Sequence, residues 1–171
     1  MKVLVTAASK YGATGEIAQA IGNVLTEYGF DTKVVPPEAV GMIEAYDAIV
    51  LGSAVYADHW LEPAKELVRR SRDAFTGRQV WIFSSGPVGD PKRKMVRKMG
   101  EEPVDVAEIR EMTKARDHRV FEGNIDRKNL SFPERALLLA FRGLEGDFRD
   151  WTEIKKWASE IANAMQSGAR G

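Results

Sequence analysis

Short apolar segments and amphipathic segments alternate through the first half of the chain. The strand-like segments are residues 2–6, 31–35, 48–52 and 79–84, and the helix-like segments are residues 14–28 and 62–71. The run Ala48–Leu51 is continuously apolar, which is typical of a strand covered by helices on both faces. Because parallel strands joined by helices need right-handed crossovers, this order predicts a doubly wound parallel sheet.

The second half of the chain is less regular. We expect a short helix over residues 104–115, a fifth strand over residues 119–125 and a last helix over residues 151–165. The prediction is therefore an α/β fold with five parallel strands, helices on both faces and an insert after the fourth strand. With 171 residues, the chain has the length of one domain. We assign residues 1–166 to it and expect residues 167–171 to be a frayed tail.

Composition narrows the classes of function. Twenty-five basic residues balance twenty-five acidic ones, so the net charge gives no general attraction to nucleic acid. The chain has no cysteine, which excludes disulfides and thiolate chemistry. No apolar run approaches the length of about 20 residues that a membrane span needs, and no secretory signal is evident. We expect a cytoplasmic protein without a transmembrane segment.

Metal and hydrolytic sites have little support in the sequence. His59 and His118 are the only histidines, and they lie on different segments without neighbouring ligand types. We therefore expect no metal site. No Ser/His/Asp arrangement occurs at a recognisable spacing, so no catalytic residue is assigned. His59 is open to two interpretations, a solvent-exposed side chain or a proton relay.

The loop between the first strand and the first helix is suited to a phosphate group. Several backbone N–H groups and the positive end of a helix dipole converge there. The triphosphate pattern Gly-x4-Gly-Lys-Ser/Thr and the dinucleotide pattern Gly-x-Gly-x-x-Gly are both absent. A terminal phosphate monoester, such as that of FMN, is the remaining class of ligand. The residues expected to surround it are Ser9, Lys10, Tyr11, Gly12, Ala13 and Thr14.

Two of these loop residues have alternative interpretations. Lys10 is either a counter-charge for the phosphate or a solvated turn residue. Thr14 is either a phosphate ligand or a helix N-cap, and the two roles are compatible.

Three segments resemble the cofactor loops of flavodoxins. Residues 9–14 (Ser-Lys-Tyr-Gly-Ala-Thr) resemble the flavodoxin phosphate loop, which reads roughly Ser/Thr-x-Thr-Gly-Asn-Thr. Residues 51–58 (Leu-Gly-Ser-Ala-Val-Tyr-Ala-Asp) resemble the strand end and loop that cover one face of the flavin. Residues 83–90 (Phe-Ser-Ser-Gly-Pro-Val-Gly-Asp) are similar to the loop on the other face. They follow the first, third and fourth strands, where a doubly wound sheet binds its ligand.

The resemblance implies a flavodoxin-like fold and FMN as the cofactor. Tyr56 would cover one face of the flavin ring, and Val88 or Pro87 the other. Ala57 stands where flavodoxins often carry glycine, and alanine resists a positive φ. The resemblance therefore implies weaker stabilisation of the one-electron-reduced flavin. The full set expected near the ring is Ala54, Val55, Tyr56, Ala57, Ser85, Gly86, Pro87, Val88, Gly89 and Asp90.

A narrower resemblance concerns the loop Tyr56–Trp60, the charged insert after the fourth strand and the last helix. These look like the branch that includes the bacterial menaquinone-dependent protoporphyrinogen dehydrogenases. The implied function is an FMN-dependent oxidoreductase with a small-molecule or quinone partner. The alternatives are a non-catalytic electron carrier served by a protein reductase, and a flavin-free interaction module. The neutral net charge favours an oxidoreductase, because carrier flavodoxins are strongly acidic.

Two further segments keep more than one interpretation. The basic stretch 92–98 is either a solvated face or a docking patch for an acidic partner, an NADPH phosphate or a tetrapyrrole propionate. The apolar run 136–141 is expected to pack against the sheet or a dimer mate, or to lie at a membrane surface. Peripheral membrane contact and a homodimer therefore both stay open.

Overall fold

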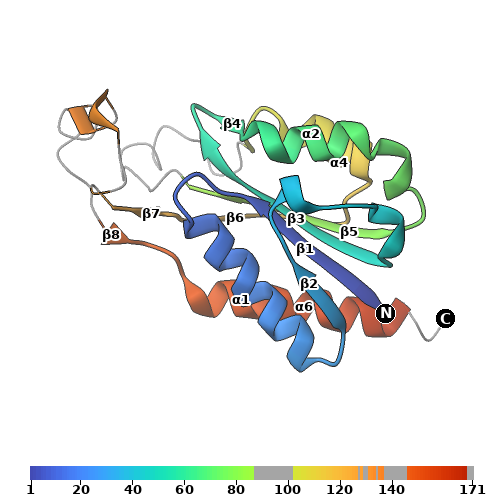
Figure 1. Cartoon of the computed structure of the whole chain (residues 1–171). Helices are drawn as coiled ribbons and strands as arrows, with labels where there is room; N and C mark the ends of the chain where they lie inside the picture. The colour runs from blue at the N-terminus through green and yellow to red at the C-terminus, as the bar shows by residue number, and fades with distance from the viewer. Residues whose placement is uncertain (87–101, 127, 129–130, 134, 137–145, 169–171) are drawn as a thin grey trace.

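A five-stranded parallel sheet forms the centre of the computed structural model (Figure 1). The structure describes residues 1–86, 102–126, 128, 131–133, 135–136 and 146–168. The strands are β1 (Lys2–Ala8), β2 (Asp31–Val34), β3 (Ala48–Tyr56), β5 (Gln79–Ser85) and β6 (His118–Phe121). They lie in the order β2-β1-β3-β5-β6, each parallel to its neighbour. This confirms the doubly wound α/β fold, in which β2 lies at one edge of the sheet.

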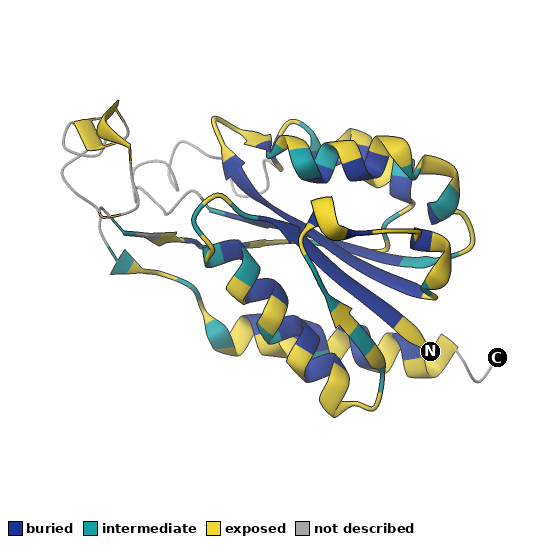
Figure 2. Ribbon diagram, viewed as in Figure 1, coloured by how far each residue is buried: buried dark blue, intermediate teal, exposed yellow. Residues whose placement is uncertain are grey.

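Helices cover both faces of the sheet (Figures 1 and 2). The helices α1 (Ala13–Glu27) and α6 (Trp151–Gly168) pack on one face, and α2 (Glu62–Arg70) and α4 (Val106–Thr113) on the other. Alternate side chains of a strand therefore enter different cores. In β5, Trp81 and Phe83 enter the α1/α6 core, while Val80 and Ile82 enter the α2/α4 core.

Gly52 of β3 allows the α1/α6 core to close over the middle of the sheet. A Cβ atom at Gly52 would lie 2.2 Å from the Phe83 ring. The ring occupies that space and packs against Phe121 and Trp157, at centroid distances of 6.0 and 6.2 Å. Glycine at this position is therefore required by the packing of Phe83 rather than by its backbone angles.

Several elements differ from their expected bounds. The strand β3 continues to Tyr56 instead of ending at Gly52, because it pairs along this stretch with β5 and with the short return strand β4 (His59–Trp60). The expected fifth strand over residues 119–125 is interrupted. After β6, the chain forms β7 (Asn124–Ile125), which pairs with β8 (Gly146–Asp147) in a separate two-stranded sheet.

The next observations concern the ends of two helices and the two segments for which the sequence allowed more than one interpretation. Gly29, with φ +89°, follows the end of α1. The helix α6 runs to Gly168, beyond its expected end at residue 165. The basic stretch 92–98 and residues 137–141 of the apolar run lie outside the described residues. The remaining connections include 3-10 turns at Pro37–Ala39, Ile43–Ala45 and Arg72–Phe75.

Candidate functional site at the carboxyl edge of the sheet

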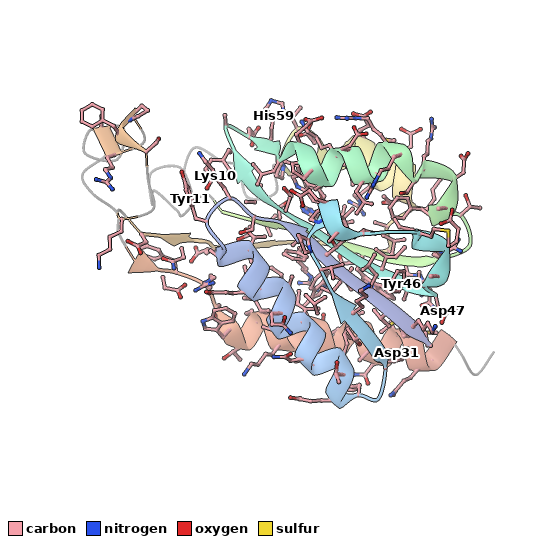
Figure 3. All side chains as sticks on the ribbon, viewed as in Figure 1. Lys10, Tyr11, Asp31, Tyr46, Asp47 and His59 are labelled. Atoms are coloured by element: carbon pink, nitrogen blue, oxygen red, sulfur yellow. The ribbon has the colours of Figure 1, made fainter. Side chains whose placement is uncertain are left out.

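The three predicted loops begin at the same level of the sheet. Ala8 of β1 is in register with Ser53 of β3, and Ser53 is in register with Ser84 of β5. The chain therefore leaves all three strands at one edge. Strand order reverses between β1 and β3, and ligands of such sheets bind at this switch point. Figure 3 labels Lys10, Tyr11 and His59 at this edge, and Asp31, Tyr46 and Asp47 at the opposite one.

The first loop leads directly into α1. Gly12 is the N-cap residue, with φ +90°, and its carbonyl accepts the first helical hydrogen bond from the Glu16 N–H. The N–H groups of the three residues between them precede that bond and have no partner within the helix. Of the two interpretations of Thr14, the helix N-cap is wrong, because Thr14 is the second helical residue. Its side chain is buried, with 3% exposed.

Lys10 connects the first loop to the end of β3. Its ammonium lies 5.0 Å from the centroid of the Tyr11 ring and 5.1 Å from that of Tyr56. Both distances are in the range of cation–π attraction. The positive charge of Lys10 therefore lies between the expected phosphate loop and the expected ring-covering residue.

The second loop is a tight β-hairpin. Val55 pairs with Trp60 and Tyr56 with His59, which leaves a two-residue turn. In it, Ala57 has φ +47° and Asp58 has φ +70°. A two-residue hairpin with positive φ at both central positions matches the twist of its strands. The expectation that Ala57 avoids positive φ is therefore wrong. The hairpin imposes it, at a cost of about 1–2 kcal/mol for a residue with a Cβ atom.

Only part of the expected second loop is accessible. Ala54 and Val55 belong to β3, not to a loop, and are 6% and 3% exposed. Tyr56 is 37% exposed, and Ala57 is also exposed. The exposed Tyr56 ring is thus the main surface that this segment offers to a flat ligand.

The third loop is described only at its start. Ser85 is the last residue of β5 and is 3% exposed. Gly86 has φ +79°, and its N–H donates to the Phe121 carbonyl at 3.0 Å. Pro87, Val88, Gly89 and Asp90 lie outside the described residues. Their contacts with a flavin stay a prediction.

The geometry of the edge fits a ligand with a phosphate and a flat ring. A Cβ atom at Gly12 or at Gly86 would meet no atom within 4 Å. Gly12 and Gly86 therefore border open space, and Tyr56 is exposed at the end of β3, the strand between β1 and β5. Backbone amides at the start of α1 and the charge of Lys10 suit an anion, and the tyrosine suits an aromatic ring.

The sequence did not reveal a buried hydrogen-bonded chain beside this edge. The Trp60 Nε1 group donates to Ser84 Oγ at 2.8 Å. Ser84 Oγ lies 2.9 Å from His118 Nε2, and His118 Nδ1 lies 3.0 Å from Glu102 Oε1. The chain contains a Ser/His/Glu contact, although no Ser/His/Asp arrangement occurs at a recognisable spacing in the sequence. Its members are 16 and 34 residues from His118, so local spacing could not reveal it.

The direction of these hydrogen bonds follows from Glu102 and from the burial of His118. A carboxylate only accepts, so His118 Nδ1 carries the ring proton and donates it to Glu102. In the neutral imidazole, Nε2 then has a free lone pair and accepts the proton of Ser84 Oγ, which itself accepts from Trp60 Nε1. Burial lowers the pKa of His118, against the opposing effect of Glu102. Since Ser84 is 0% exposed, the chain is an internal support rather than an accessible nucleophile.

Arg149 links the turn before α6 to the first turn of α1. Its guanidinium is 4% exposed and pairs with Asp147 at 2.6 Å and Glu16 at 2.5 Å. It also donates to the Ala13 carbonyl at 3.1 Å. Hydrogen bonding to Asp147 raises the pKa of Arg149. The segment that returns through β8 is thereby attached to the loop expected to bind phosphate.

Neither a metal cluster nor a membrane-spanning helix occurs in the part of the chain that the structure describes. These residues contain no group of three or more His, Cys, Asp or Glu side chains that could hold a metal ion. Within the same residues, no helix has both the length and the apolar character needed to cross a bilayer.

Comparison with known proteins identifies the family of this chain. The model of the flavodoxin domain family matches residues 4–150. The chain belongs to the flavodoxin domain family. No curated protein matches it.

Solved structures share the flavodoxin fold along the whole chain. A flavodoxin from the domain Archaea is 19% identical, with a TM-score of 0.64 over 97% of this chain and 99% of that one. Flavodoxin 1 from Bacillus cereus is 17% identical, with a TM-score of 0.61 over 95% and 98%. Rubredoxin oxygen:oxidoreductase from Desulfovibrio gigas is 13% identical, with a TM-score of 0.65 over 99% of this chain and 37% of that longer one.

Proposed function

We propose that this flavodoxin-domain protein binds FMN at the carboxyl edge of its sheet and transfers electrons between redox partners. The observation that carries the proposal is the arrangement of the first loop. The first amides of α1 have no partner within the helix, and Lys10 lies between this helix start and the exposed ring of Tyr56. Family membership supports a flavin as the ligand.

Each part of the edge would have a separate role. The amides of residues 10–14 would bind the phosphate, with the hydroxyls of Ser9 and Thr14 as additional donors. Tyr56 and Ala57 would cover one face of the ring, and residues 85–90 the other. The bound flavin would supply the electron-transfer chemistry, and the protein its binding and orientation.

A finer proposal concerns the partner. We propose a quinone-linked oxidoreductase similar to the menaquinone-dependent protoporphyrinogen dehydrogenases, rather than a general electron carrier. The balance of 25 basic and 25 acidic residues supports this choice, because the chain lacks the net negative charge that attracts basic carrier partners. Oxidation of protoporphyrinogen with a menaquinone analogue tests it. A rate equal to the spontaneous oxidation would reject this finer proposal and leave FMN binding intact.

The cofactor proposal is tested by flavin content and affinity. We expect the purified protein to be yellow and to release FMN when it is denatured. The flavin-free protein should bind FMN more tightly than riboflavin, because only FMN carries the phosphate. A colourless protein that binds neither compound would refute the proposal and favour a flavin-free interaction module.

A further inference from the structure

The tip of the β3–β4 hairpin is held by a segment far away in the sequence. The Asp105 carboxylate accepts a hydrogen bond from the Trp60 N–H at 2.7 Å and lies 3.2 Å from His59 Nδ1. Its side chain is 15% exposed, and the Lys65 ammonium lies 3.9 Å away. One carboxylate thus contacts both residues of β4.

A backbone contact extends this attachment to the turn itself. The Val104 N–H donates to the Asp58 carbonyl at 3.1 Å. Asp58 is the second of the two turn residues with positive φ. Residues 104 and 105 therefore bind both the turn and the strand that follows it.

The hairpin needs such support because its own interactions are few. It has only two residue pairs, and neither turn residue is glycine. An unfavourable backbone conformation persists only where the surrounding structure fixes it. Side chains of the central sheet fix the base of the hairpin. The Leu61 N–H donates to Ser53 Oγ at 2.9 Å, and Trp60 Nε1 donates to Ser84 Oγ. The tip is contacted by residues 104 and 105.

We propose that Asp105 is a positioning residue for the flavin ring. It fixes the hairpin so that Tyr56 and Ala57 present one preformed surface to the ring. This inference rests on the proposed function, because the ring is the part of FMN assigned to this hairpin. Preorganisation of a binding surface lowers the entropy lost on binding. The effect of Asp105 should therefore concern the ring and not the phosphate.

The test compares Asp105→Ala with Glu108→Ala in the full chain. Glu108 is also acidic, is exposed and lies in the first turn of α4, so it controls for charge and for the helix. Hydrogen exchange of peptides that cover residues 56–61 is measured without flavin, and affinities are measured for FMN and riboflavin. Asp105→Leu, which has about the size of aspartate but no acceptor for the Trp60 N–H, repeats the measurements if the alanine variant fails to fold.

We expect faster exchange in residues 56–61 and unchanged exchange in β1 for the Asp105 variants. Both flavins should bind about tenfold more weakly, with their affinity ratio unchanged. The inference is overturned by unchanged exchange, by faster exchange throughout the protein, or by a loss confined to FMN. If the unmodified protein binds neither flavin, the proposed function fails and the ring-positioning role with it. The exchange data then still decide whether Asp105 fixes the hairpin.

Discussion

His118 Nε2 and Ser84 Oγ lie 2.9 Å apart in the interior, and in the neutral form of the histidine Nε2 accepts the Ser84 proton. The His118 side chain is 2% exposed. The charged groups around it are Glu102, Arg110 and Asp117, and burial has the largest effect on its pKa, which is lowered. Protonation of Nε2 would replace the acceptor of the Ser84 proton with a second donor.

The lowered pKa predicts a pH dependence of stability. Below the unfolded pKa of about 6.5, the unfolded chain binds a proton at His118 that the folded protein resists. The contribution of His118 is therefore complete above that pH and decreases as the pH falls toward the folded pKa. We expect the free energy of unfolding to fall less steeply between pH 7 and 5 in His118→Gln than in the unmodified protein. Urea titrations at several pH values measure this, and equal slopes would contradict it.

Thr14→Val should weaken the binding of phosphate more than it weakens the fold. Valine has nearly the same shape as threonine but cannot donate to the phosphate, and a hydrogen bond to a charged group contributes about 1.5–3 kcal/mol. The affinity for FMN should fall about tenfold or more, and the affinity for riboflavin should stay the same. Thr26→Val, at the other end of α1, is the matched control. Equal losses for both flavins would place the phosphate elsewhere.

Gly52→Ala should destabilise the protein through a single contact. The new Cβ atom would lie 2.2 Å from the Phe83 ring, which is confined by Phe121 and Trp157. Overpacking of this kind costs about 1–3 kcal/mol. Gly41→Ala, where no atom lies within 4 Å of the new Cβ, should change the free energy of unfolding by less than about 0.5 kcal/mol. Phe83→Leu in the Gly52→Ala background should recover part of the loss. If Gly52→Ala were as stable as Gly41→Ala, the Phe83 ring would not require glycine at position 52.

Ala57→Gly should stabilise the protein or leave it unchanged, although glycine usually destabilises. Ala57 has φ +47° and is exposed, so its replacement relieves backbone strain without loss of packing. The relief of about 1–2 kcal/mol exceeds the entropic cost of glycine, about 0.5–1 kcal/mol. Ala164→Gly, at an exposed position within α6, should instead lose about 0.5–1 kcal/mol. Thermal unfolding of the two variants compares them directly. Similar losses in both would show that residue 57 is not strained.

The sequence by itself determined the alternation of strands and helices, the parallel sheet and the first loop. These features depend on patterns within a few residues, such as the apolar run at Ala48–Leu51 and the small and polar residues between the first strand and the first helix. Local chemistry is enough for such patterns, because a buried strand and a helix end each impose their own residue types.

Only the tertiary structure decided how the edge of the sheet is supported. The positive φ of Ala57 is set by pairing between β3 and β4, which overrides the preference of alanine. Asp105 contacts Trp60 across 45 residues, and Arg149 contacts Ala13 across 136. Hydrogen bonds between distant segments depend on which parts of the chain the folded sheet brings together. The residue types within one segment therefore cannot predict these contacts.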